Sequence, residues 1–144
     1  MTITVLATTS ATPERVWGVL SDLRSWPGWL PTIQSLEPAA PEAPEGVGAT
    51  YTVKQPRLPR ARWTVTDWTH GTGFSWRSKS PGLTTIGTHE LRGGSGSGTE
   101  VVLAIGWRGP LAWLARVAYG PMTRRYVETE ASALVARAEQ VPAG

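Results

Sequence analysis

Hydrophobic and polar residues alternate along most of the chain between residues 49 and 107. In "GFSWRSKS", Phe74 and Trp76 point to one face of a strand while Arg77 and Lys79 point to the other. This is typical of a sheet with one face on the core and one face in solvent. The same alternation defines inward positions on neighbouring strands: Tyr51, Val53, Trp63, Val65, Val101, Leu103, Ile105 and Trp107. The pattern predicts one long sheet with a concave apolar face.

Glycine- and proline-rich turns separate the predicted strands. The sequences "PRLP", "HGTG", "SPG" and "GGSGSG" divide this region into strands at 49–55, 61–69, 73–80, 83–92 and 99–107. Two more strands are expected at 2–9 and 33–37, and residues 38–48 are expected to form an exposed loop. Because sequential strands with short connections usually pair side by side, we expect an antiparallel meander of about seven strands.

Helix signals follow the first predicted strand. Thr12 is a candidate N-cap, Pro13 occupies the first helical position, and apolar residues recur after them at helical spacing. Pro27 disfavours helix at Trp26, so the chain is expected to stop and form a short second helix. The adjacent tryptophans and prolines of "SWPGWLP" predict a rigid corner, where Trp29 above all holds this helix against one end of the fold.

The C-terminal segment 109–140 is rich in Ala, Leu, Arg and Glu, which favours helix. A break is expected at Gly120 and Pro121, after which Pro121 restarts a helix that ends near Gln140. The side expected to face the sheet carries Met122, Tyr126, Thr129 and Ala133, with Val127, Leu134 and Ala138 beside it. We expect this segment to cover the concave apolar face.

The composition narrows the class of protein. The 144 residues include 8 Trp, 3 Tyr, 1 Phe and no Cys, and a chain of this length is most simply one domain, 1–144. So many indoles suit a thick core or a ligand pocket, and the lack of cysteine excludes disulfides and a Cys-based metal site or nucleophile. Without an export signal or a long apolar stretch, we expect a cytoplasmic protein with no integral membrane association.

Basic residues concentrate in one segment of a chain whose net charge is only +3. "KQPRLPRAR" contains Lys54, Arg57, Arg60 and Arg62 and no acid. Such a cluster could contact phosphate or an anionic membrane surface, or simply form a solvated loop or edge strand. No zinc-finger spacing or RNP-like aromatic motif accompanies it, so nucleic acid is not an expected partner.

Two histidines and one aspartate are candidates for acid–base chemistry. His70 lies in the turn "WTHGTG" and is expected at the surface. Charge on Glu90 favours an orientation in which His89 faces the concave side, as a general acid or base, an anchor for a ligand oxygen, or a wall residue satisfied by a hydroxyl or water. Asp67 follows Val65 in strand register, which places it inward opposite His89; the alternative is a rim position that caps the next turn.

The sequence offers few other residues for catalysis or ligand binding. The hydroxyl groups of Tyr51 and Tyr126 could bind a substrate carbonyl, although each residue also suits an ordinary core. No Ser-His-Asp nucleophile pattern occurs, and "RGGSGSG" lacks the Lys and the strand-to-helix context of a phosphate loop, so a hairpin is expected there. No metal-ligand spacing is recognisable, and we expect neither a metal nor a cofactor.

Longer motifs span nearly the whole chain. They are "ATPERVWGVLSDLRSWPGWLPTIQSLE", which includes Asp22 and the turn from Trp29 to Ile33, then "VTDWTHGTGFSWRSKSPG", the His of "THEL", "GSGTEVVLAI" and the "GPL" before the last helix. In these motifs the chain resembles the START-like (SRPBCC) superfamily, especially its polyketide cyclase/dehydrase and lipid-transport branch. The resemblance implies an α+β helix-grip fold, in which a curved antiparallel sheet wraps around a long C-terminal helix and two short helices follow the first strand. It implies an apolar ligand, but it does not fix an activity.

These observations favour a protein that binds a small hydrophobic molecule, lipid-like, aromatic or polyketide-like, between the sheet and the C-terminal helix. One alternative is an aromatase/cyclase-type enzyme in which His89 and Asp67 move protons. Another is a partner-binding module that uses the arginine-rich edge. If the indoles fill the space, no ligand site exists. The residues expected to contact the ligand are Tyr51, Trp63, Val65, Phe74, Trp76, His89, Leu103, Ile105, Met122 and Tyr126.

Overall fold

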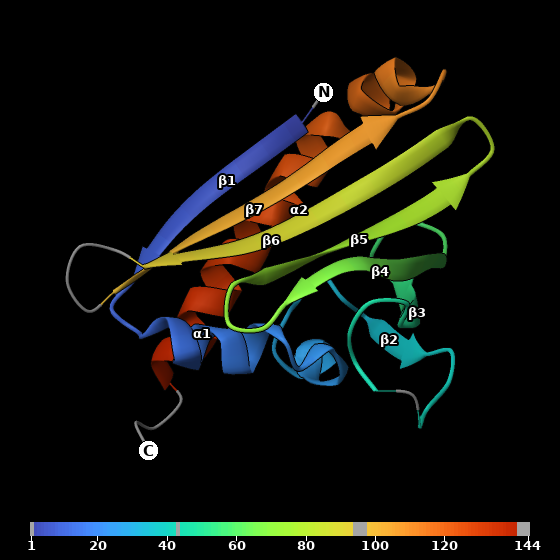
Figure 1. The fold of residues 1–144 in the computed structure, drawn as a ribbon. Helices are drawn as coiled ribbons and strands as arrows, with labels where there is room; N and C mark the ends of the chain where they lie inside the picture. The colour runs from blue at the N-terminus through green and yellow to red at the C-terminus, as the bar shows by residue number, and fades with distance from the viewer. Residues whose placement is uncertain (1, 43, 94–97, 141–144) are drawn as a thin grey trace.

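A computed structural model describes residues 2–42, 44–93 and 98–140, and it shows one curved sheet wrapped around a long helix (Figure 1). The strands are β1 (Thr2–Thr9), β2 (Ser35–Pro38), β3 (Thr50–Lys54), β4 (Ala61–Thr69), β5 (Gly73–Ser80), β6 (Leu83–Gly93) and β7 (Thr99–Arg108). The helices are α1 (Pro13–Leu20), the 3₁₀ helix η1 (Leu23–Gly28) and α2 (Ala112–Gln140). This element order confirms the predicted helix-grip fold.

The sheet has seven strands in the order β1-β7-β6-β5-β4-β3-β2, and every neighbouring pair is antiparallel. The first strand pairs with the last, with Thr2 opposite Gly106. Because β1 and β2 form opposite edges of the sheet, α1 and η1 must cross between them, and they close one end of the curve. The glycine-rich hairpin expected between β6 and β7 falls mainly on residues 94–97, outside the described residues.

The corner after α1 depends on Trp26 more than on Trp29. The Thr12 hydroxyl caps α1 by accepting a hydrogen bond from the backbone N–H three residues on, at 3.3 Å. At the other end, the indole N–H of Trp26 donates to the carbonyl of Leu20, at 3.2 Å, and this carbonyl has no partner within the helix. Trp26 is 1% exposed, whereas Trp29 is half-buried and donates to the Ser25 hydroxyl at 3.0 Å. The buried indole therefore fixes the corner.

The long helix α2 continues through Gly120 and Pro121, where the sequence predicts a break. Proline has no N–H to donate within a helix and bends it, and the helix changes direction near its first third instead of ending (Figure 1). Thr129, which was expected to face the sheet, is exposed. The buried stripe lies beside the predicted one: Ala115, Gly120, Val127, Ala131, Leu134 and Ala138. Small residues in this stripe let the helix approach the sheet closely.

Within the described ranges, no helix is both long enough and apolar enough to cross a membrane.

Candidate functional site

The helix α2 covers the two halves of the sheet unequally. Its backbone lies mainly against β1, β7 and α1, and it diverges from β3, β4 and β5 (Figure 1). On the near half, short and branched side chains meet the helix: Val5, Val101 and Leu103 pack in one cluster with Ala131 and Leu134. On the far half, the inward side chains are large: Tyr51, Trp63, Phe74 and Trp76. Aromatic rings occupy much of the wider gap on the far half.

Trp26 from η1 lies in the middle of this aromatic cluster. The centroid of its indole is 5.4 Å from that of Trp76, 6.1 Å from that of Phe74 and 5.7 Å from that of the His89 imidazole. Trp76 in turn lies 5.1 Å from Trp63. The inward orientation expected for Trp63, Phe74 and Trp76 agrees with their burial. Their rings occupy much of the space that the sequence left open to a ligand.

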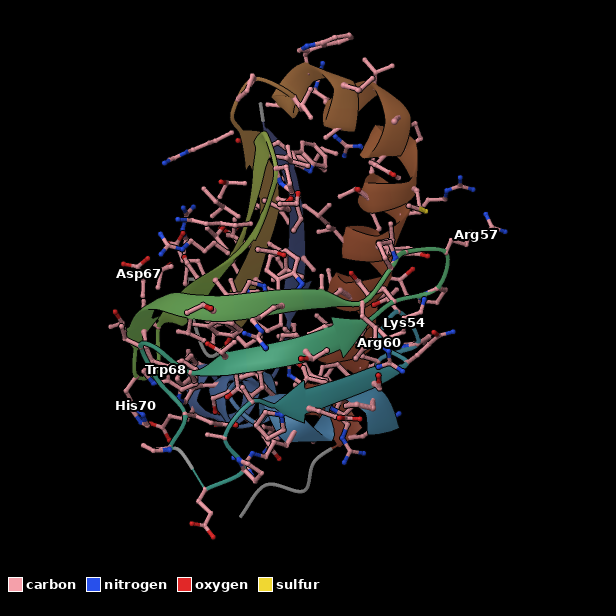
Figure 2. All side chains as sticks on the ribbon, turned by 90° about the vertical axis from the view of Figure 1, so that its right-hand side faces the viewer. Lys54, Arg57, Arg60, Asp67, Trp68 and His70 are labelled. Atoms are coloured by element: carbon pink, nitrogen blue, oxygen red, sulfur yellow. The ribbon has the colours of Figure 1, made fainter. Side chains whose placement is uncertain are left out.

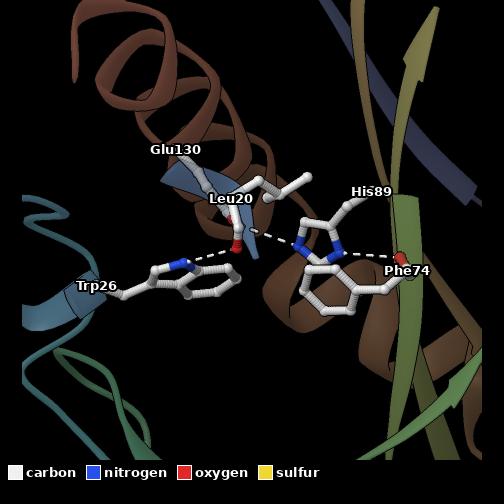
Figure 3. Close-up of polar contacts among 5 residues, drawn as sticks. All are labelled: Leu20, Trp26, Phe74, His89 and Glu130. Atoms are coloured by element: carbon white, nitrogen blue, oxygen red, sulfur yellow. Dashed lines mark hydrogen bonds and ion pairs between the residues drawn. The ribbon is translucent and has the colours of Figure 1, made fainter. Parts of the chain in front are cut away.

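His89 joins the sheet to the helix within the aromatic cluster (Figure 3). It is 6% exposed, and its imidazole stacks on the ring of Phe74 with centroids 4.2 Å apart and planes 14° apart. Its Nδ1 lies 3.3 Å from the Phe74 carbonyl oxygen, and its Nε2 lies 3.3 Å from Oε1 of Glu130 on α2. The Glu130 side chain is 21% exposed. The sheet and the helix are thus linked by a polar pair among aromatic residues.

The partners of His89 indicate where its protons lie. The Phe74 carbonyl can only accept a hydrogen bond, so Nδ1 must carry a hydrogen to bond with it. A carboxylate oxygen also only accepts, so the contact between Nε2 and Glu130 requires a second proton, on either the imidazole or the carboxyl group. Protonation of either group makes this contact a hydrogen bond or an ion pair. A ligand oxygen placed beside the pair could receive that proton.

Asp67 does not form the predicted pair with His89. The register between β4 and β5 shifts between Val65 and Asp67, which leaves Thr66 as an extra residue. Beyond this bulge the alternation reverses: Trp68 packs on the core, and Asp67 is exposed and accepts a hydrogen bond from the Thr66 hydroxyl at 2.9 Å (Figure 2). The expectation of an inward carboxylate on β4 is wrong because a bulge turns the side chain to the other face.

His70 lies at the surface, as expected, and its ring contacts Trp17 with centroids 5.7 Å apart.

The two tyrosine hydroxyls do not converge on His89. Tyr126 on α2 is half-buried, and its hydroxyl donates to the backbone carbonyl of Pro56, which holds the loop between β3 and β4 against the helix. Tyr51 is 2% exposed and contacts Trp76, with ring centroids 6.3 Å apart. It lines a separate pocket of about 170 Å³ with Arg24, Pro38, Ala39, Ala40, Gly48, Ala49 and Thr50.

Burial changes the ionisation of two groups near this pocket. Burial raises the pKa of the Tyr51 hydroxyl, the negative charge of Glu45 raises it further, and Arg24 opposes both effects. Burial also raises the pKa of Glu45, with a further contribution from Asp22, although a hydrogen bond from the backbone of Leu23 opposes the shift. The prediction of an exposed loop at 38–48 is therefore wrong at Glu45, which is half-buried.

The remaining expected contact residues differ in burial. Val65 and Leu103 are fully buried in the main core cluster, whereas Ile105 and Met122 are half-buried.

Glu130 and Trp26 are site residues that the sequence analysis missed. Glu130 lies three residues after Val127 and four before Leu134, both of which belong to the buried stripe of α2. A carboxylate at that spacing is unusual on a buried helix face, and this feature of the sequence could have identified Glu130. Trp26 gave no comparable signal, because its direction depends on the turn of η1.

Among the described residues, no group of three or more His, Cys, Asp or Glu side chains is placed to hold a metal ion.

A curved antiparallel sheet around a long C-terminal helix, with short helices after the first strand, defines the helix-grip fold. The chain belongs to the family described as Polyketide cyclase / dehydrase and lipid transport, whose model matches residues 1–139. No curated protein sequence matches the chain.

Solved structures with the same fold include two enzymes. The Zhui aromatase/cyclase from Streptomyces sp. R1128 is 18% identical, with a TM-score of 0.78 over 97% of this chain and 94% of that one. Norcoclaurine synthase from Thalictrum flavum, in complex with dopamine and hydroxybenzaldehyde, is 12% identical, with a TM-score of 0.78 over 100% of this chain and 89% of that one. The protein TTHA0849 from Thermus thermophilus is 22% identical, with a TM-score of 0.75 over 96% of this chain and 97% of that one. At these identities the likeness shows the fold alone.

Proposed function

We propose that the protein binds a small aromatic or polyketide-like molecule between the β3–β5 half of the sheet and α2, with the His89–Glu130 pair as the polar anchor. The observation that supports this most is the position of the pair inside the aromatic cluster. A buried ionisable pair costs desolvation free energy, and apolar residues of similar size often stabilise a core as well or better. An ionisable pair kept in apolar surroundings is therefore a candidate for function.

The aromatic cluster is suited to flat ligands. A two-ring molecule that buries about 250 Å² of apolar area gains about 6 kcal/mol from burial, before the entropic cost of binding is subtracted. Such a ligand would replace contacts that Trp63 and Trp76 now make with each other.

Acid–base catalysis on such a ligand is a second candidate function, and the contact between the His89 imidazole and the Glu130 carboxyl group, two groups that can exchange a proton, favours it. Glu130 would take the role that the sequence analysis assigned to Asp67. The pair could protonate a ligand oxygen from one side and take the proton back when the product forms. Other members of the fold include an aromatase/cyclase, which makes this class of reaction a reasonable one to test.

Calorimetric titration with 2-naphthol and with naphthalene tests the binding proposal. The two probes differ only in one hydroxyl, and a hydrogen bond from that hydroxyl to the pair is expected to make 2-naphthol bind about tenfold more tightly. The preference should disappear in His89→Phe and persist in Glu90→Gln, which changes an exposed residue on the opposite face of β6. Equal affinity for the two probes in the wild-type protein, or no binding of either, would contradict the proposal.

Native mass spectrometry of the purified protein provides an independent check. A co-purifying apolar molecule, released when the protein is denatured, is expected if the aromatic cluster binds a natural ligand.

A further inference from the structure

The first third of α2 exposes large apolar side chains. Trp113 is 59% exposed, Leu114 is 45% exposed and Val117 is 70% exposed. Leu111 and Tyr119, on either side of them, are 43% and 45% exposed. Trp113 and Val117 are four residues apart and Leu114 is adjacent, so these three share one side of the helix. A cluster of exposed apolar residues of this kind marks an interaction surface.

The same stretch is basic. Arg108, Arg116, Arg124 and Arg125 are all exposed, and the sequence contains no acidic residue between positions 101 and 127. The exposed apolar residues therefore lie in a stretch of the chain whose charged residues are all basic.

A second basic segment lies beside this helix. The hydroxyl of Tyr126 donates to the carbonyl of Pro56, so the loop between β3 and β4 is held against α2. Arg57 and Arg60 in that loop are exposed, and Figure 2 shows Arg57 projecting outward on the side of α2. Lys54 instead donates to the carbonyl of Gln55, at 2.7 Å. The arginine-rich edge noted in the sequence thus lies against α2 at Tyr126, the residue that follows Arg124 and Arg125.

We propose that the exposed apolar residues of α2, together with the arginines beside them, dock on the surface of an anionic lipid bilayer. Tryptophan and tyrosine are enriched where the headgroups meet the acyl chains, and Leu and Val can enter the boundary below them. Arginine binds phosphate groups in bidentate geometry, and anionic headgroups attract basic segments. A second copy of the chain is a poorer occupant, because self-association through this surface would bring its arginines close to one another. The proposal does not depend on the ligand site.

Vesicle co-sedimentation tests the docking surface. The wild-type protein is expected to sediment with phosphatidylcholine vesicles that contain about 30% phosphatidylserine, to bind pure phosphatidylcholine far less, and to be released as salt rises from about 0.05 M to about 0.5 M. The double variant Arg124→Glu, Arg125→Glu should bind at least tenfold more weakly, since each charge removed costs about fivefold. The double variant Trp113→Ser, Val117→Ser should also bind at least tenfold more weakly.

Matched controls use the outer face of the sheet and another exposed apolar residue. Arg77→Glu with Lys79→Glu makes the same charge change at exposed positions of β5, and Leu6→Ser removes a side chain that is 61% exposed. Both controls should sediment like the wild type. The proposal is overturned if phosphatidylserine gives no binding, or if the controls lose binding as much as the α2 variants. A dimer in analytical ultracentrifugation that Trp113→Ser, Val117→Ser dissociates, without vesicle binding, would assign the surface to a second copy instead.

Discussion

The two halves of the sheet pack against α2 in different ways. On the β1 and β7 side, the helix approaches closely, and residues such as Val101 and Leu134 are completely buried. On the β3–β5 side, the helix lies farther away, and indoles together with one histidine occupy much of the gap. Close packing on the β1 and β7 side leaves no spare volume, so side chains there can be neither moved nor enlarged without cost. The other half contains the rings and the polar pair that a ligand could engage.

Leu134→Ala should give the largest effect, and the effect should be on stability. The side chain is 0% exposed on the closely packed half, so its truncation is expected to lower the free energy of unfolding by about 2–5 kcal/mol. Urea denaturation measures this loss, with Ser132→Ala on the exposed side of the helix as control. The affinity of the folded protein for 2-naphthol should be unchanged. A loss of affinity at full stability would show that the two halves are not distinct.

Gly87→Ala should strain the aromatic half. A β-carbon at this position would lie 2.8 Å from the indole nitrogen of Trp76 and 3.4 Å from the side chain of Ile105, so the indole must shift. We expect a loss of about 1–3 kcal/mol in the free energy of unfolding and a changed affinity for 2-naphthol. Gly18→Ala is the control, because a β-carbon there meets nothing within 4 Å. If Gly87→Ala leaves both stability and affinity unchanged, Trp76 is not packed as described.

Glu130→Gln should change the protonation of the polar pair with little effect on stability. The Gln amide can donate to Nε2 of a neutral His89, so the additional proton is no longer required and the free energy of unfolding should change by less than about 1 kcal/mol. The imidazole ¹⁵N chemical shifts of this variant should differ from those of the wild type, and any turnover should be lost. Glu128→Gln, at an exposed position, should behave like the wild type. Identical imidazole shifts in Glu130→Gln and the wild type would contradict the contact between Nε2 and Glu130.

Glu45→Gln should give the smallest effect, and it should depend on pH. Burial raises the pKa of Glu45 in the folded protein, so ionisation is less favourable there than in the unfolded chain. Wild-type stability should therefore fall as pH rises through the unfolded value, near 4.5, and then through the higher folded value. The uncharged Gln still accepts from Leu23. The melting temperature of the variant should thus exceed that of the wild type at pH 7, and the two values should converge near pH 4. A variant less stable than the wild type at pH 7 would show that the charge of Glu45 stabilises the fold.

Much of the fold could be predicted from the sequence because its signals are local. Alternation and turn residues placed β4 at 61–69 and β5 at 73–80, the bounds that the structure has. The C-terminal helix was less predictable at Pro121, because packing on the sheet can sustain a helix through a proline that would end an isolated one.

The candidate site was only partly predictable because it joins distant elements. The inward side of His89 followed from the charge of its neighbour on β6, and it is confirmed by the burial of His89. Asp67 was misplaced because a single extra residue in a bulge reverses alternation without a clear sequence signal. Glu130 was missed because its meeting with His89, 41 residues earlier in the chain, depends on how α2 crosses the sheet.

The eight tryptophans allow the most direct test of where a ligand binds, because each indole N–H gives its own NMR signal. On titration with 2-naphthol, the signals of Trp26, Trp63 and Trp76 should shift together. The signals of Trp113, on the exposed turns of α2, and Trp107, in a separate apolar cluster, should stay in place. A titration that moves only Trp113 or Trp107, or leaves the three clustered indoles unmoved, would contradict a ligand site in the aromatic half of the sheet.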